Sequence, residues 1–350
     1  MRAVTHETAV SDNPGVTDSA PPPATFADEH AFAEAAERHR RELHVHCYRM
    51  VGNFEEAEDL VQETLLRAWR ARASFERGVA EGKSGNVRAW LYRIATNACL
   101  DTLRGSSSRR LVSFDSYAEV PWLQPYPDRL LDELATDNEP EAAAVARETI
   151  ELAYVAMIQL LPARQRAVLI LRDVVGWSAK QTADALDLTV PAANSALQRA
   201  RATLADRALE RDEVAAEEWE PTEEEQRLLA GFIDAHQRGD FEASLALMHE
   251  DIRVTMPPLP MVYDGREAMT SLLDTAFGAE ESMGEWRLVP AWANRQPAAL
   301  SYLRRPGDSE FRAFKVDVIR IADGKIREIT TFDARLLASF GLPEILPTDD

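Results

Sequence analysis

The chain of 350 residues contains only two cysteines, Cys47 and Cys99, and no C-x-x-C pair. This scarcity excludes a disulfide framework and fits a reducing compartment, so we expect a cytoplasmic protein. The chain also lacks any apolar run of roughly 20 residues, the length that a helix needs to cross a bilayer, so we expect no membrane contact. Residues 1–25 have neither a basic start nor an apolar core, and their Pro, Ser and Thr content predicts a disordered tail instead of a signal peptide.

A surplus of positive charge is missing as well, since the formal net charge is −20 at pH 7. The charge is unevenly distributed along the chain. Residues 30–110 carry 14 Lys and Arg against 11 Asp and Glu, and residues 162–211 carry 8 against 5. Residues 111–161 and 212–350 are strongly acidic. Because phosphate neutralisation dominates DNA affinity, two such weakly basic modules predict a protein that reaches DNA only within a larger assembly.

The segment Asn53–Trp69, NFEEAEDLVQETLLRAW, predicts one helix with two different faces. A mostly apolar stripe follows helical spacing at Ala57, Leu60, Val61, Thr64, Leu65 and Ala68. The opposite side is an acidic ridge formed by Glu55, Glu58, Asp59, Gln62 and Glu63. A lone charge run is usually no more than solvated surface, so the ridge by itself does not identify a binding site.

A Gly-containing loop is expected over Ser74–Asn86, and a further helix over Val87–Arg104. One side of this helix combines the residues Arg88, Tyr92, Arg93, Asn97 and Asp101. An aromatic ring beside arginines and an amide can stack on unpaired bases and hydrogen-bond them. The alternative, that Trp90 and Tyr92 are core aromatics, suits Trp90 better than Tyr92.

The segment SAKQTADALDLTVPAANSALQRARATL predicts two short helices joined by a tight turn, with Ser178 as the N-cap of the first. An apolar face of the second helix comprises Ala193, Leu197, Ala200 and Leu204. Its outer face offers Asn194, Ser195, Gln198, Arg199 and Arg201. Amides can pair with adenine edges, and arginines with guanine or phosphate, so we interpret the pair as a DNA-binding helix-turn-helix. The alternative is a plain helical hairpin.

The motifs AEDLVQETLLRAW and VRAWLYRIATNACLDTL resemble region 2 of the sigma-70 family, and the helix-turn-helix resembles its region 4. The resemblance implies that the acidic ridge binds the largest subunits of bacterial core RNA polymerase. It further implies that Arg88, Trp90, Tyr92, Arg93 and Asn97 open and hold the promoter −10 element, with Asn97 at the pocket for a flipped-out base. The outer face of the second helix of the helix-turn-helix would contact the −35 element.

Four departures from the region 4 pattern leave the −35 sequence open. Asp187 and Pro191 stand where glycines are common, and Asn194 and Ala196 replace frequent basic residues. The expected domains are region 2 over 26–110, an acidic linker over 111–146, and region 4 over 147–211. Region 2, a linker and region 4 alone are typical of the extracytoplasmic-function (ECF) group, in which the linker lies in the RNA exit path and the active cleft. The apolar stretch Val120–Leu123 predicts that this linker is more than a bare tether.

After Trp219 the composition changes, and residues 212–350 predict helices followed by a curved sheet, an α+β cone. This unit resembles the SnoaL-like branch of the NTF2 superfamily. With VPWLQPYPD, ANRQPAA and FGLPEIL, the whole chain is most similar to the actinobacterial sigma-G type. The fold class is therefore multi-domain: two all-α sigma modules followed by an α+β NTF2-like cone.

Cones of this kind enclose a pocket, and some relatives use a pocket carboxylate for proton abstraction. The candidate lining is Met256, Trp286, Trp292, Tyr302, Asp317 and Asp333, with Glu328 as a further carboxylate. Aromatics in such a sheet are more often core than ligand box, and no His–Asp pair is visible. We therefore expect a regulatory domain without catalysis.

The residues His39, His44, His46 and Cys47 are the types that bind zinc, but adjacent helix positions point apart, so we expect neither a metal nor a cofactor. The predicted function is an ECF sigma factor whose activity the tail tunes, with core polymerase and promoter DNA as partners. An anti-sigma factor or a small ligand of the tail are further candidate partners. The alternatives are a free-standing helix-turn-helix regulator and a SnoaL-like isomerase or cyclase fused to a DNA-binding module.

Overall fold

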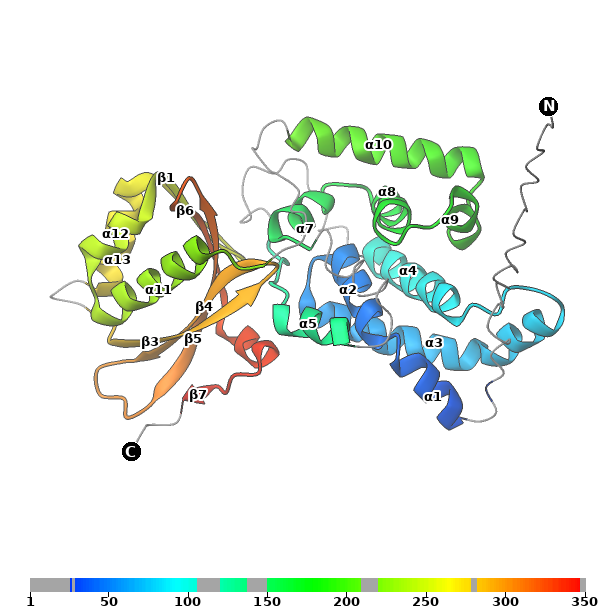
Figure 1. Ribbon diagram of the computed structural model, residues 1–350, viewed down its shortest axis with the longest axis horizontal. Helices are drawn as coiled ribbons and strands as arrows, with labels where there is room; N and C mark the ends of the chain where they lie inside the picture. The colour runs from blue at the N-terminus through cyan, green and yellow to red at the C-terminus, as the bar shows by residue number, and fades with distance from the viewer. Residues whose placement is uncertain are drawn as a thin grey trace, which may run out of the picture.

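The computed structural model describes residue 26 and residues 29–105, 120–136, 150–208, 220–277 and 282–346. Figure 1 shows a helical half and a sheet half, with the sheet standing between its own helices and the helical half. None of the described helices is both long and apolar enough to cross a membrane.

Region 2 is a bundle of four helices: α1 (Glu29–Glu37), α2 (Arg40–Val51), α3 (Phe54–Ala80) and α4 (Val87–Gly105). Gly52 ends α2 in the left-handed conformation, and the Asn53 side chain accepts a hydrogen bond from Glu56 N to cap α3. The expected loop from Ser74 is wrong at its start, because α3 continues to Ala80. α1 and α2 are separated by a break at His39, which lets Phe32 pack against Trp69 with 5.3 Å between ring centroids.

The described part of the linker packs on region 2, and its helix α5 spans Asp128–Thr136. Val120, Leu123 and Tyr126 are buried in the same core as α2. Gln124 N donates to Gly52 O at 3.0 Å, and Tyr48 Oη donates to Gln124 O at 2.8 Å. The expectation that this segment is more than a tether is confirmed for residues 120–136, while 111–119 and 137–146 lie outside the described residues.

Region 4 comprises α7 (Leu152–Ile158), α8 (Ala163–Leu169), the π-helical turn η3 (Ile170–Val174), α9 (Ala179–Ala185) and α10 (Val190–Ala208). Ser178 and Gln181 form a capping box at the start of α9, which confirms the predicted N-cap. Asp187 adopts a φ of 52° in the turn before α10, which explains why a glycine would fit the same position. The buried Arg166 guanidinium donates to Met50 O and joins region 4 to region 2.

The tail begins with the helices α11 (Glu223–Arg238) and α12 (Phe241–Leu247), and α13 (Gly265–Phe277) follows the second strand. Its strands are β1 (Met248–Met256), β2 (Leu259–Asp264), β3 (Glu285–Ala293), β4 (Gln296–Arg304), β5 (Phe311–Ala322), β6 (Lys325–Asp333) and β7 (Ile345–Leu346). The strand order is β2-β1-β6-β5-β4-β3, with β7 paired to β5 and η4 (Ala334–Phe340) after β6. The α+β prediction is confirmed, and β2, which contains Pro260, lies at the edge of the sheet, where a proline is tolerated.

The two faces of the sheet belong to different cores. The inner face, with Leu288 and Ile319, packs against α11 and α13. The outer face, with Leu300 and Val318, shares one continuous apolar cluster with α2, α4 and the linker. Burial of apolar surface therefore holds the tail on the sigma modules.

The two-residue turn between β3 and β4 inserts into the helical half. Asn294 is fully buried, and its Oδ1 accepts from Tyr126 N at 2.7 Å. Its Nδ2 donates to Ile150 O at 2.5 Å and to Tyr48 Oη at 3.0 Å. Both turn residues have positive φ, 54° for Asn294 and 58° for Arg295, as a type I′ hairpin turn requires. One amide side chain thus links region 2, the linker and the segment before α7 to the tail.

We expect Asn294→Ala to weaken this docking by about 2 kcal/mol, because it leaves buried backbone groups without a hydrogen-bond partner. The measurement is the midpoint of thermal unfolding together with the rate of limited proteolysis. Asp323→Ala is the control, since Asp323 also has positive φ, 53°, but is exposed in the β5–β6 turn. Equal effects of the two substitutions on the thermal midpoint and the proteolysis rate would mean that the positive φ, and not the hydrogen bonding of Asn294, accounts for the loss of stability.

Candidate polymerase and promoter interfaces

The acidic ridge lies on the open side of α3, and the stripe that faces the core is buried at Ala57, Leu60, Val61, Thr64 and Ala68. Most ridge residues have partners within the chain. Glu55 Oε2 accepts from Gln124 Nε2 at 2.8 Å, Glu58 pairs with Arg40, and Glu63 lies 2.7 Å from Arg67. Glu55, Asp59 and Gln62 are exposed. Glu55 lies at the start of the helix, so Asp59 is the exposed carboxylate in the middle of the ridge.

The side of α4 that was expected to read DNA is only partly exposed. Tyr92 is 2% exposed, and its hydroxyl donates to Glu42 Oε2 at 3.0 Å. Arg88 Nε donates to the same oxygen at 2.8 Å. Burial raises the pKa of Tyr92. The prediction that Tyr92 is an outward-facing base reader is therefore wrong for this conformation, because its ring and hydroxyl are both used in the core.

Trp90 is half-buried and stacks on Phe75, with ring centroids 4.4 Å apart. The Phe26 ring belongs to the same aromatic cluster, and its centroid lies 6.5 Å from that of Trp90. The core interpretation that was left open for Trp90 is thus the one that the packing supports.

Region 4 lies against the remaining α4 residues. Arg93 Nη2 is 3.7 Å from Asp187 Oδ1, in the turn of the helix-turn-helix. Asn97 Nδ2 donates to Arg93 O at 3.0 Å and reaches Ala185 O, at the end of α9, at 3.5 Å. Arg93 and Asn97 are therefore brought together on one surface, and the helix-turn-helix partly covers that surface.

The outer face of α10 is accessible. Asn194, Gln198, Arg199 and Arg201 are exposed, and Ser195 is half-buried. Arg199 Nη1 donates to Ser195 Oγ at 2.6 Å, and Arg201 makes two bonds to Asp173, at 2.7 and 2.8 Å. Figure 1 shows α10 along the outside of the helical half. The predicted −35 residues thus share one open helix face.

The histidines near Cys47 serve the core of region 2. His39 Nδ1 lies 2.6 Å from Glu42, His44 Nδ1 3.1 Å from Tyr126 Oη, and His46 Nε2 2.9 Å from Thr96 Oγ1. Burial lowers the pKa of His44 to about 4 and that of His46 to about 3, so both rings are neutral near pH 7. They act as uncharged hydrogen-bonding groups.

The candidate tail pocket is not assembled as expected. Trp286 packs in the inner core, with Met256 and Trp292 partly buried against it, whereas Tyr302 belongs to the outer cluster and donates to Pro343 O at 2.8 Å. Asp333 caps η4 by accepting from Arg335 N at 2.8 Å. Including Tyr302 and Asp333 in the pocket was wrong. The Tyr302 side chain lies on the outer face of the sheet, and the Asp333 side chain caps η4.

Asp317 is fully buried and lies 2.7 Å from Lys315 Nζ and 2.7 Å from Thr331 Oγ1. Lys315 and Asp317 are two residues apart in a regular stretch of β5, so their side chains lie on the same face of the sheet. The cation beside Asp317 is therefore Lys315 and not Arg312, which pairs with Glu310.

A cavity of about 600 Å³ lies elsewhere, beside strands β1, β2, β5 and β6. It is lined by Asp251, Arg253, Asp264, Gly265, Arg320, Arg327 and Glu328. Of these only Glu328 was named from the sequence. The signal that could have revealed the rest is the presence of charged residues in the middle of otherwise apolar strands.

Comparisons with known proteins match this division of the chain. The sigma-70 region 2 family matches residues 35–109, sigma-70 region 4 matches 151–204, and the SnoaL-like domain family matches 229–329. The ECF RNA polymerase sigma factor SigG of Mycobacterium tuberculosis is 40% identical over 331 residues, which cover 90% of this chain and 85% of SigG. The chain belongs to the ECF group of sigma factors.

Another ECF sigma factor of M. tuberculosis, SigM, is 31% identical over 51% of this chain and 77% of its own length. The crystal structure of M. tuberculosis SigJ is similar, with a TM-score of 0.52 and 21% identity over 86% of this chain and 95% of that one. The prediction of an ECF sigma factor with a SnoaL-like tail is thus confirmed.

We expect Asp59→Lys to weaken binding to core RNA polymerase by at least about 10-fold, because like charges across an interface cost several kcal/mol. Co-elution with core enzyme measures the effect. Glu81→Lys is the matched control, since Glu81 is an exposed carboxylate at the far end of the same helix. Undiminished co-elution of the Asp59 variant would refute the ridge as the docking surface.

Asp128 provides a pH-dependent contact between linker and tail. Burial raises its pKa to about 7, although Arg295 Nη1 lies 3.6 Å away and Arg295 N donates to it at 3.1 Å. A raised pKa means that the folded form holds a proton that the unfolded form releases. The contribution of Asp128 to stability is therefore present at low pH and lost as pH rises through about 7.

We expect Asp128→Asn, which does not titrate, to gain stability relative to the parent protein between about pH 5 and pH 7.5. The thermal midpoints of both proteins across this range measure it. The difference between the two proteins is the quantity of interest, because the buried His44 and His46 affect both in the same way and with the opposite sign. A difference independent of pH would contradict the assignment.

Proposed function

We propose that this ECF sigma factor acts in the cytoplasm, where it binds core RNA polymerase through the acidic ridge of α3. It then reads the −10 element with α4 and the −35 element with α10, and the tail tunes these steps. What supports the polymerase role is the division of α3 into a buried apolar stripe and an open acidic ridge centred on Asp59.

Base reading by α4 depends on Arg93 and Asn97, since Tyr92 is held in the core by Glu42. Both readers contact region 4 through Asp187 and Ala185. Promoter melting therefore requires region 4 to move away from α4 when the polymerase spreads the two modules. The exposed face of α10 can contact duplex DNA without this movement.

The tail acts through the β3–β4 turn. Asn294 and Arg295 enter a socket built from Tyr48, Tyr126 and Asp128, so the tail is bonded to region 2 and the linker at once. On the other side of this contact, Arg129 Nη2 donates to Ser339 O at 2.7 Å. A tail held in this way restricts how far the linker can move, and movement of the linker sets the separation of the sigma modules.

We propose no catalytic role for the tail. The relatives similar over most of the chain are sigma factors. Within the cone, Asp317 is engaged by Lys315 and Thr331 in the manner of a structural ion pair.

The decisive experiment is transcription from a candidate promoter with purified core polymerase, with and without this chain. We expect Asn97→Ala to reduce open-complex formation severalfold while co-elution with core enzyme is unchanged, because contacts to unpaired bases are lost. Permanganate reactivity of promoter thymines measures the opening. Full reactivity of the variant would exclude Asn97 as a −10 reader.

The same assay tests the tail. Deleting the tail would expose the apolar face that it covers, so the full chain carrying Asn294→Ala is the better probe. We expect its promoter activity to differ severalfold from that of the parent and of the Asp323→Ala control. Equal activity of all three proteins would show that docking of the turn does not tune initiation.

A further inference from the structure

The outer face of the tail sheet carries a row of alternating charges. Asp264, Arg253, Glu328 and Arg320 are register neighbours across β2, β1, β6 and β5. Arg253 Nε lies 2.6 Å from Asp264 Oδ1, and Arg320 Nε lies 3.1 Å from Glu328 Oε2. The Glu328 side chain is only 4% exposed.

This row is not explained by packing. Two residues before Arg320 on β5, Val318 packs into the apolar cluster that joins the sheet to the helical half. Apolar side chains along the row would extend that contact, whereas the nearly buried carboxylate of Glu328 costs free energy unless it is paired. The charged groups instead border a cavity of about 600 Å³, within the range of small-ligand sites.

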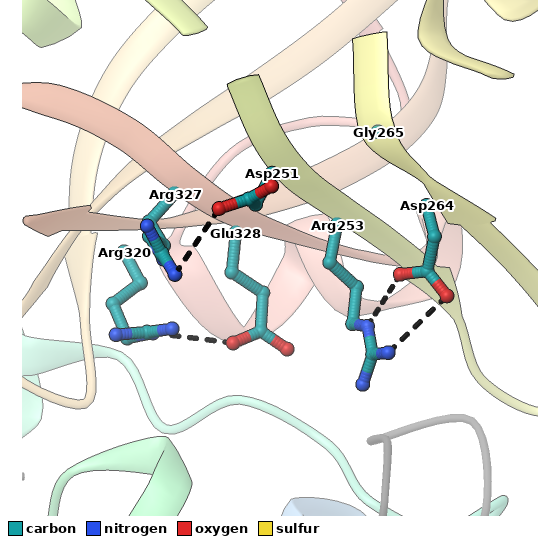
Figure 2. A pocket seen from close by; sticks show the side chains of 7 residues that line it. All are labelled: Asp251, Arg253, Asp264, Gly265, Arg320, Arg327 and Glu328. Atoms are coloured by element: carbon teal, nitrogen blue, oxygen red, sulfur yellow. Dashed lines mark hydrogen bonds and ion pairs between the residues drawn. The ribbon is translucent and has the colours of Figure 1, made fainter. Parts of the chain in front are cut away.

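Six of the seven residues that line the cavity are charged, and three of these are arginines. Figure 2 shows the charged ends of Arg253, Glu328 and Arg320 directed to the same side of the sheet, with Asp251 and Arg327 beside them. The side chains of Arg253, Arg320 and Arg327 are each about one-third exposed, at 34%, 32% and 34%. Their guanidinium groups are therefore held in place by carboxylates and still accessible from the cavity.

We propose that this cavity binds a small anionic molecule that carries carboxylate or phosphate groups. A guanidinium offers five N–H donors in a fixed planar fork, which matches both of these groups. Arg320 donates to Glu328 through its Nε, so its terminal nitrogens are not needed for that bond. Glu328 orients Arg320 and at the same time repels an incoming anion, so it sets the affinity of the site.

Two opposite effects follow from this arrangement. Arg320→Gln removes a ligand-binding cation and should weaken anion binding by about 10-fold, as expected for the loss of a charge-assisted hydrogen bond. Glu328→Gln keeps the shape of the side chain but removes the central negative charge, and should strengthen anion binding severalfold. A gain in affinity cannot arise from misfolding.

Isothermal titration of the full chain with pyrophosphate and, separately, with citrate tests the proposal and distinguishes phosphate from carboxylate ligands. Arg304→Gln is the matched control, because Arg304 is also about one-third exposed, at 33%, and pairs with a carboxylate across a strand pair, Glu285, away from the cavity. We expect saturable binding of at least one anion, weakened about 10-fold in Arg320→Gln and unchanged in Arg304→Gln. The proposal would be overturned by any of three results: no saturable binding, an equal loss of affinity in both arginine variants, or weaker anion binding by Glu328→Gln.

Discussion

The insertion of Asn294 into the helical half is the contact on which the arrangement of the whole chain depends. Its amide satisfies groups from region 2, the linker and the segment before α7, and these come from three separate stretches of sequence. A buried amide must find partners for its donors and its acceptor, so only one placement of the tail is compatible with it. The apolar outer face of the sheet supplies the area of contact, and Asn294 supplies its specificity.

The sigma modules pack so that only one of the two surfaces predicted to read DNA is fully exposed. Arg166 binds the end of α2 through Met50 O, and Asn97 and Arg93 meet the helix-turn-helix at its turn. The surface expected to read melted DNA is partly covered, whereas α10 remains open. Because the two modules carry little positive charge, we expect this arrangement to restrict DNA contact outside the polymerase.

Charge is organised differently in the two halves. In region 2, Glu42 gathers His39, Arg88 and Tyr92 into a buried network that holds α2 to α4. In the tail, the charged row from Asp264 to Arg320 lines a cavity. Buried polar networks rigidify a core when every member is satisfied, whereas charges at a cavity remain available to a ligand.

The sequence by itself determined the type and order of the modules, because helical periodicity, the capping residue Ser178 and alternation in the strands are local properties. It also separated the buried and open faces of α3. Only the tertiary structure decided that Tyr92 belongs to the core, that Tyr302 and Asp333 lie outside any common pocket, and that Arg253 and Glu328 are neighbours. Each of these depends on a partner distant in sequence, such as Glu42 for Tyr92 or β6 for β1, and on strand register and bulges. Local patterns carry no information on which distant groups will satisfy a buried hydroxyl or carboxylate, because that pairing is set by the packing of elements against each other.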